Sequence, residues 1–458
     1  MNLALKQTRK REALEAGGRR KWLAVVTCFL LFMHLAETGR SASEYEYIDI
    51  DSPFLRKIPI AIPVFFPIQN NNMTSPLLQN TTDLLTETLI FTGFFSLVDR
   101  EAYLIDPQKP PIVADDINFS NWKTVGAELL ITGAMALDGN QISLELRLFD
   151  TLTGKRLIGK RYGGTVDDLR QIIRRFCSEI ILQFTGHRGV FDSKIAFVST
   201  GSGNKEIYIS EFDGNAPEQL TRHGKISLFP AWSSDGDWIA YTTYVNDKPD
   251  IYIQDLTSNQ KMVIDKKGIN IAPAWRPGEF QLAATLSFSG NQEIYLLTGT
   301  GKIIKRITRN WASDVSPTWS PDGKKMAFVS NRSGSPQIFL KDIDSGQVER
   351  LTFEGNYNTQ PSWSPAGGRI AFTSSVDGGN EIFVIDVANR ETTRLTRNSG
   401  YNESPSWSPD GSLIVFSSTR EGPSRIYVMT AYGTDQRRLL TLPGEQSNPR
   451  WSPNLSKN

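Results

Sequence analysis

Six polar residues recur at equivalent places in the second half of the sequence, each five positions ahead of a tryptophan. They are Ser227, Asn270, Asp314, Asn358, Asn402 and Gln446. Gathered around one opening, their hydrogen-bonding groups would suit a protein or peptide ligand better than a charged metabolite, since only Asp314 is acidic. One position earlier, four of the six places carry an apolar or aromatic residue: Ile226, Ile269, Tyr357 and Tyr401. Ser, Asn and Asp also cap turns ahead of strands, so a structural role stays open.

Motifs that carry catalysis or bind metals are missing from the sequence. Of the three histidines, His34 lies in an N-terminal export signal, and neither His187 nor His223 has a Cys or carboxylate at metal-ligand spacing. There is no GxSxG elbow, Walker loop, HExxH or CxxC. The glycine-rich TGSGN at 200–204 falls between two strand-like runs, where a hairpin turn explains it. We therefore expect no catalytic site, no metal and no cofactor.

The tryptophans themselves repeat with a fixed period of 43 residues once and 44 residues four times. They are Trp232, Trp275, Trp319, Trp363, Trp407 and Trp451. Three further patterns keep this period: an apolar triplet that first occurs at Ile195, an Ile-Tyr or Ile-Phe pair first at Ile207, and a Leu-Thr-like ending first at Leu220. Four short strand-like runs per unit, separated by turn residues, predict the blades of a six-bladed β-propeller.

The order of the runs also predicts how the propeller closes. The first unit lacks a tryptophan strand, whereas a tryptophan strand without a unit of its own, PRWSP at 449–453, follows the last unit. Giving this strand to the first unit completes six four-stranded blades. Proline ahead of the tryptophan suits a strand start, and the broad indole is expected to fill the gap between blades.

The segment before the repeats mixes strand and helix patterns and predicts a small α/β domain over 58–188. Strands are expected at 58–66, 128–137, 141–150 and 155–164, and helices at 82–95 and 166–185. Thr165 and Asp168 form a capping box for the second helix, and Gly186 ends it. Cys177 lies on the apolar stripe of this helix, so a reactive thiol is not expected. The predicted fold is thus multi-domain, with this α/β domain followed by the propeller over 189–458.

The N-terminus reads as an export signal over 1–43, with cleavage between Ser43 and Glu44. A basic stretch precedes an apolar run of 15 residues at 22–36, which is short for a membrane span, so no direct membrane insertion is expected. Arg19-Arg20 resembles a twin-arginine signal, but the general secretion route is favoured. Without the signal, 42 basic and 46 acidic side chains give a net charge of 42 − 46 = −4, which argues against nucleic-acid binding.

Three strings in the first half, together with the repeated PxWSPDG, resemble the TolB family of the Tol-Pal system. They are GFFSLVDREAY (93–103), NFSNWKTVGAELLITG (118–133) and LRQIIRRFCSEIILQFTGHRGVFDSKIAFVS (169–199). The resemblance covers nearly the whole chain after the signal. One departure is Arg174, at a position where histidine is common in the family, so any special role of that histidine does not carry over.

The resemblance implies a non-enzymatic, monomeric periplasmic adaptor that supports outer-membrane integrity and constriction during cell division. Its implied partners are the lipoprotein Pal, the inner-membrane-anchored protein TolA and other outer-membrane proteins. By position, Pal is expected at the propeller mouth, on Ser227, Ile269, Asn270, Ala272, Asp314, Val315, Asn358 and Asn402. TolA is expected on a mobile segment at 44–57, through Tyr45, Tyr47, Ile48 and Ile50.

An alternative from another class is a periplasmic propeller enzyme or carbohydrate-binding protein that uses the central channel. Such a protein needs converging carboxylates or a metal constellation. Of the six ring residues only Asp314 is acidic, so the sequence favours the adaptor.

Overall fold

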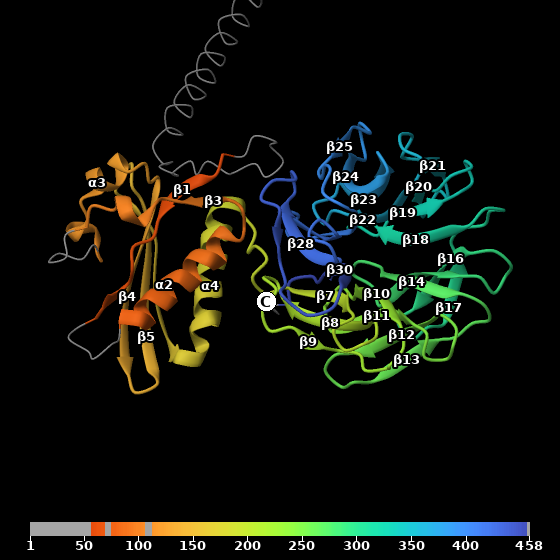
Figure 1. Ribbon diagram of the computed structural model, residues 1–458, viewed down its shortest axis with the longest axis horizontal. Coiled ribbons are helices and arrows are strands. Elements are labelled where there is room, and N and C mark those ends of the chain that lie inside the picture. Colours follow the sequence, from red (N-terminus) through yellow and green to blue (C-terminus); the bar gives the residue numbers. More distant parts are fainter. Residues whose placement is uncertain (1–55, 69–74, 106–111, 456–458) are drawn as a thin grey trace, which may run out of the picture. The chain divides into compact units, whose positions relative to one another are not determined.

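The computed structural model describes residues 56–68, 75–105 and 112–455 (Figure 1). The first part holds a six-stranded sheet in the order β3-β1-β4-β5-β6, with β2 beside β4. Its strands are β1 (Ile58–Ala61), β2 (Phe66–Pro67), β3 (Phe95–Leu97), β4 (Leu129–Asp138), β5 (Gln141–Asp150) and β6 (Arg156–Thr165). β1 is parallel to β3 and β4, whereas β4, β5 and β6 form an antiparallel meander.

Two helices, α2 (Ser75–Ile90) and α4 (Leu169–Thr185), lie side by side and pack on this sheet (Figure 1). On β5 every second residue from Ile142 to Leu148 is buried, so the strand turns one apolar face to the helices. The short helix α3 (Phe119–Thr124) contributes Trp122 to a separate apolar cluster with Leu130 and Phe149. Short 3-10 turns complete the part at Arg100–Ala102, Ala114–Asp116 and Val166–Asp168.

Of the two predicted helices, the second is confirmed and the first has other bounds. The capping box at Thr165 and Asp168 is present, with the Asp168 carboxylate accepting the Thr165 N–H at 2.8 Å, and Gly186 ends α4 in the left-handed region at φ 75°. Cys177 is buried, and burial raises the pKa of its thiol. The helix predicted at 82–95 instead runs from Ser75 to Ile90, because Pro76 suits a first helical turn and the sequence analysis overlooked it.

Residues 194–451 form six four-stranded antiparallel sheets, as the period predicts. Five blades are each formed by four consecutive strands. The first of these holds β10 (Ser227–Trp232), β11 (Trp238–Thr243), β12 (Asp250–Asp255) and β13 (Lys261–Ile264), and the second holds β14 (Asn270–Trp275), β15 (Gln281–Leu286), β16 (Glu293–Thr298) and β17 (Ile303–Arg306). The third holds β18 (Asp314–Trp319), β19 (Lys325–Ser330), β20 (Gln337–Asp342) and β21 (Val348–Arg350). The next two are β22 (Asn358–Trp363), β23 (Arg369–Val376), β24 (Gly379–Asp386), β25 (Thr392–Arg394); and β26 (Asn402–Trp407), β27 (Leu413–Ser418), β28 (Arg425–Thr430), β29 (Arg437–Arg438).

The remaining blade joins the two ends of the propeller. Its strands are β30 (Gln446–Trp451), β7 (Lys194–Ser199), β8 (Glu206–Glu211) and β9 (Glu218–Gln219), in that order. β30 pairs antiparallel with β7, so the last strand of the chain completes the first blade and the predicted closure is confirmed.

The repeated tryptophans tie neighbouring blades together. The indole N–H of Trp275 donates to the main-chain oxygen of Ala231 in the preceding blade at 3.2 Å, and Trp319 does the same to Ala274 at 3.1 Å. Trp451 instead donates to the Ser193 hydroxyl at 2.7 Å. The bonds of Trp275 and Trp319 join strands of different blades, whereas the Trp451 bond lies within the closing blade. The indoles also fill the space between blades, which explains the repeated motif. In the described part of the chain, no helix is long and apolar enough to cross a bilayer.

Candidate functional site

The first strands of the six blades contact one another in a closed ring around the propeller axis. They are β10, β14, β18, β22, β26 and β30. We call the end where these strands begin the mouth face. It carries the loops that lead from each outermost strand to the next first strand, such as 307–313, and the loops that join second and third strands, such as 287–292.

The six ring residues begin these first strands, and all six side chains are completely buried. The side-chain amide of Asn270 donates to the main-chain oxygen of Lys266 at 2.7 Å, and that of Asn358 donates to the oxygen of Glu354 at 2.7 Å. These amides satisfy carbonyl groups of the loop that precedes their strand. The structure therefore shows the loop-capping role for Asn270 and Asn358, and all six ring side chains are closed to solvent. A role of the ring residues in binding Pal stays a prediction.

A second set of polar side chains lies buried beside the ring and was missed by the sequence analysis. These residues lie at or near the start of a third strand and are at most 3 % exposed: Glu206, Asp250, Glu293 and Gln337 begin theirs, and Glu381 is the third residue of β24. The hydroxyl of Thr308 donates to Glu293 at 2.6 Å, and Arg306 pairs with the same carboxylate at 2.8 Å. The signal was available in the sequence, because an acidic residue or Gln precedes five of the six Ile-Tyr or Ile-Phe pairs.

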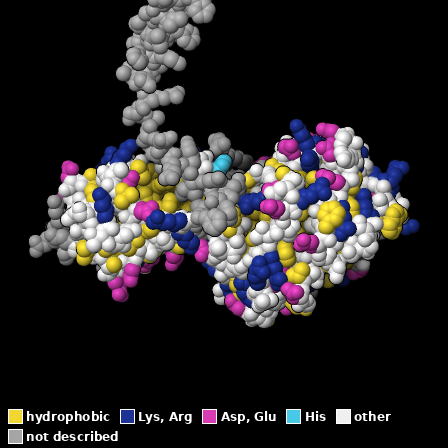
Figure 2. Space-filling model, turned by 90° about the horizontal axis from the view of Figure 1, so that it is seen from above, with side chains coloured by type: hydrophobic (Ala, Val, Ile, Leu, Met, Phe, Trp, Pro, Cys, Tyr) yellow, Lys and Arg dark blue, Asp and Glu magenta, His cyan; other side chains and the backbone are white. Residues whose placement is uncertain are grey.

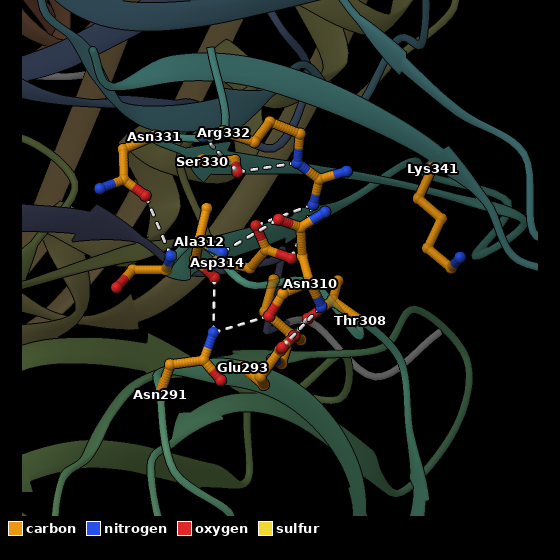
Figure 3. Close-up of polar contacts among 12 residues, drawn as sticks. Asn291, Glu293, Thr308, Asn310, Ala312, Asp314, Ser330, Asn331, Arg332 and Lys341 are labelled. Carbon is orange, nitrogen blue, oxygen red and sulfur yellow. Dashed lines mark hydrogen bonds and ion pairs between the residues drawn. The ribbon is translucent and has the colours of Figure 1, made fainter. Parts of the chain in front are cut away.

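Asp314 is the ring residue that carries a charge, and it is held differently from its neutral counterparts (Figure 3). One terminal nitrogen of Arg332 donates to both Asp314 oxygens, at 2.7 and 2.9 Å. The Arg332 guanidinium also lies over the Phe339 ring, 4.9 Å from its centre. Burial raises the pKa of Asp314, and the nearby Glu293 carboxylate adds to the rise, while Ser330 and Arg332 oppose it.

While the polar groups point inward, the loop tips of the mouth face present large apolar side chains to solvent. Trp311 is 79 % exposed and Phe353 is 61 % exposed, and both were missed because the sequence analysis considered only the position next to the ring. Tyr357 and Tyr401, which it did name, are exposed, as is Ile226. Figure 2 shows hydrophobic side chains, in yellow, standing among Lys and Arg side chains on the surface of the propeller. Exposed aromatic groups of this kind are typical of protein interfaces.

Comparisons with known proteins agree with this architecture. The model of the TolB β-propeller domain matches residues 182–455, and that of the TolB amino-terminal domain matches 46–157. The chain belongs to the TolB family. The Tol-Pal system protein TolB of Desulfosudis oleivorans is 55 % identical over 269 residues, which cover 59 % of this chain and 61 % of that protein. The protein TolB homolog of Chlorobium chlorochromatii is 43 % identical over 302 residues, covering 63 % and 66 %. This chain thus spans less than two thirds of the length of these two relatives.

A crystal structure of TolB from Acinetobacter baumannii superimposes with a TM-score of 0.75 at 27 % identity, covering 87 % of this chain and 97 % of that one. The predicted fold, an N-terminal α/β part followed by a six-bladed propeller, is confirmed. The domain boundaries near residues 43, 57 and 188 stay predictions.

The other predicted site residues of this TolB-family chain fall into two groups. Ile269, Ala272 and Val315 are partly exposed near the mouth face, and Ala272 takes a left-handed backbone with φ 52° at a bulge of β14. The residues predicted for TolA and for signal cleavage lie outside the described residues: Ser43, Glu44, Tyr45, Tyr47, Ile48 and Ile50. The role of either group in binding a partner stays a prediction.

Two further residues named from the sequence have ordinary structural partners. Arg174, at the family's histidine position, pairs with Glu211 at 2.7 Å and lies over the Phe212 ring. A ring nitrogen of His223 lies 3.1 Å from the Tyr241 hydroxyl, and burial lowers the pKa of this histidine. Within residues 56–68, 75–105 and 112–455, no three His, Cys, Asp or Glu side chains gather in a way that could hold a metal ion.

Proposed function

We propose that this chain is a non-enzymatic periplasmic adaptor of the Tol-Pal system that links Pal to TolA. In this role it supports outer-membrane integrity and constriction during cell division. Membership of the TolB family and relatives named as Tol-Pal system proteins support the assignment. The export signal expected over residues 1–43 supports the compartment.

The proposal rests mainly on one observation: the mouth face combines buried polar side chains with exposed aromatic ones. Its ring residues are buried, and Asn270 and Asn358 are bonded within their own loops, whereas Trp311, Phe353 and Tyr401 are exposed on mouth loops. Exposed aromatic side chains on internally braced loops are suited to bind a protein surface. We assign Pal to this face, with Ile269, Ala272 and Val315 as direct contacts and the buried ring residues as supports.

TolA is assigned to the segment freed by signal cleavage, residues 44–57. It mixes four acidic residues with Tyr45, Tyr47, Ile48 and Ile50, which are good strand formers. Such a segment can join a partner's sheet edge by β-strand addition.

The test is calorimetric titration of the exported chain with purified Pal and, separately, with the periplasmic part of TolA. We expect saturable binding of each partner. Removal of residues 44–51 is expected to abolish TolA binding and to leave the Pal affinity within a few-fold of the parent, because Pal is assigned to a different surface. Absence of Pal binding by the folded parent would overturn the proposal. Parental TolA affinity after the deletion would remove the segment from it.

A further inference from the structure

We propose that Trp311 is the anchor of the Pal interface, a rigidly presented indole that enters an apolar pocket rimmed by carboxylates on Pal. This inference rests on the proposed function and adds the residue and the chemistry of its binding surface.

Exposure sets Trp311 apart from the other large apolar side chains. At 79 % it is more exposed than Leu152, at 63 %, or Phe353, at 61 %, which come next among the described residues. The repeated tryptophans lie between blades, where five of the six indoles donate an internal hydrogen bond. The Trp311 ring has no aromatic or hydrogen-bond partner within the described ranges, so folding gives no reason for a tryptophan here. Exposed tryptophan is favoured where a partner covers it.

The loop that carries Trp311 is fixed on both sides of it (Figure 3). The side-chain amide of Asn291 donates to the main-chain oxygens of Asn310, at 2.7 Å, and of Ala312, at 2.8 Å. The Asn310 N–H donates to the buried Glu293 carboxylate at 2.7 Å. The Ser313 N–H donates to the Asn331 side-chain oxygen at 2.9 Å. Because both neighbouring peptides are held, binding orders little more than the indole itself, which favours affinity.

The same place in other mouth loops holds no large apolar residue. Three positions before the ring residue, four of the other five loops carry Gly224, Gly355, Ser399 or Pro443. A glycine or serine suffices there for the loop to close. The indole is therefore an addition to a common loop and points to a function particular to this sector of the mouth face.

Charge on the same sector indicates the chemistry of the partner. Arg309 is exposed two residues before Trp311, and Arg222, Lys266 and Lys267 are exposed on the two preceding mouth loops. None of these four side chains forms an ion pair within the part of the chain that the structure describes. One exposed carboxylate, Asp265, stands beside Lys266, so these four cations outnumber it; Glu354 and Glu445 lie on mouth loops that follow the Trp311 loop. A partner that covers Trp311 thus meets unpaired positive charge, which selects carboxylates around its pocket.

The experiment measures Pal binding by the full exported chain carrying Trp311→Ala. Leu152→Ala is the matched control, because Leu152 is also an exposed apolar side chain but lies outside the propeller. We expect Trp311→Ala to weaken Pal binding at least about 30-fold, the loss typical of an interface hot spot, and Leu152→Ala to change it less than about threefold. Both variants should melt within a degree or two of the parent, since neither side chain is packed in a core.

Two further measurements separate the outcomes. Arg309→Glu should weaken binding and reduce its salt dependence, because a favourable charge becomes unfavourable. Acrylamide should quench tryptophan fluorescence more in the parent than in Trp311→Phe, because the Trp311 indole is exposed. Saturating Pal should remove this difference. A folded Trp311→Ala chain that binds Pal within threefold of the parent overturns the anchor and leaves the proposed function standing. Failure of the parent to bind Pal overturns both.

Discussion

The mouth loops before β18 and before β26 are built from almost the same parts, yet one contains Asp314 where the other contains Asn402. Beside each of them, on the loop that joins the second and third strands, an arginine, Arg332 or Arg420, lies over an aromatic ring and reaches the ring residue. The Asn402 amide donates to the buried Glu381 at 2.9 Å and accepts from Arg420 at 3.1 Å.

Asp314 has no amide to donate, so it faces the equivalent Glu293 carboxylate as a second buried anion. The fold can bury a second carboxylate at this position because two arginines offset the negative charge. Arg332 pairs with Asp314, and Arg306 pairs with Glu293. Asn291 and Asn331 then bond the loop backbone from outside the ring.

The largest expected effect comes from removing the arginine that reaches each ring residue. Arg332→Ala leaves the Asp314 carboxylate buried without its partner and should lower the free energy of unfolding by about 3–5 kcal/mol. Arg420→Ala leaves a neutral amide oxygen without a donor and should cost about 1–3 kcal/mol. Both variants lose the same stacking on aromatic rings, so their difference isolates the charge. Urea unfolding followed by tryptophan fluorescence measures both.

A double variant controls for packing. In Arg332→Ala with Asp314→Asn no uncompensated charge remains, so most of the excess loss should be recovered. Equal losses for Arg332→Ala and Arg420→Ala, or no recovery in the double variant, would contradict the account of Asp314 as a charge that depends on Arg332.

A smaller effect, with a pH signature, is expected from Asp314→Asn alone, which copies the Asn402 arrangement. Burial raises the pKa of Asp314 above its ordinary value of 3.8, so the folded state holds this proton more tightly than the unfolded state. The parent therefore loses stability as the pH rises from about 3.8 through the raised pKa, and the variant lacks this loss. Unfolding titrations between pH 3.5 and pH 8 should show the variant gaining on the parent and then levelling. A difference that is independent of pH would rule out ionisation of Asp314 as the cause.

The sequence predicts the fold well and the mouth poorly, and the reason is the range of the interactions. The six blades follow from a period that runs through residues 195–451, and the capping box at Thr165 and Asp168 involves neighbours three residues apart. The burial of Asn270 depends on Asp250, which lies in the preceding blade and offers its carboxylate at 3.2 Å. A polar residue at the end of a loop can be either exposed or buried. Which of the two occurs depends on whether a hydrogen-bond partner lies beside it in the folded chain.

Trp311 escaped prediction for a related reason. Six tryptophans of this sequence follow the repeat and lie on first strands of the blades. Trp311 lies in a loop outside this pattern, so the periodicity does not reveal it. The cue that was available is comparison between loops, since glycine, serine or proline occupies the matching place in four others. Reading the repeats against one another would have separated the residues that build the loops from the one that is added.

The smallest expected effect tests whether the loop before β18 depends on its extra bracing. Asn291→Ala removes two hydrogen bonds to the oxygens of Asn310 and Ala312, which water can partly replace, so we expect a loss of about 1 kcal/mol in unfolding free energy. Ser399→Ala in the loop before β26 is the control, because the Ser399 hydroxyl accepts one bond, from the Asn402 amide at 3.1 Å, and braces no loop carbonyl among the described residues. If bracing presents Trp311, Asn291→Ala should also weaken Pal binding several-fold by loosening the indole, whereas Ser399→Ala should not. Calorimetric titration measures both, and an unchanged Pal affinity in Asn291→Ala would mean that the loop holds Trp311 in place without this residue.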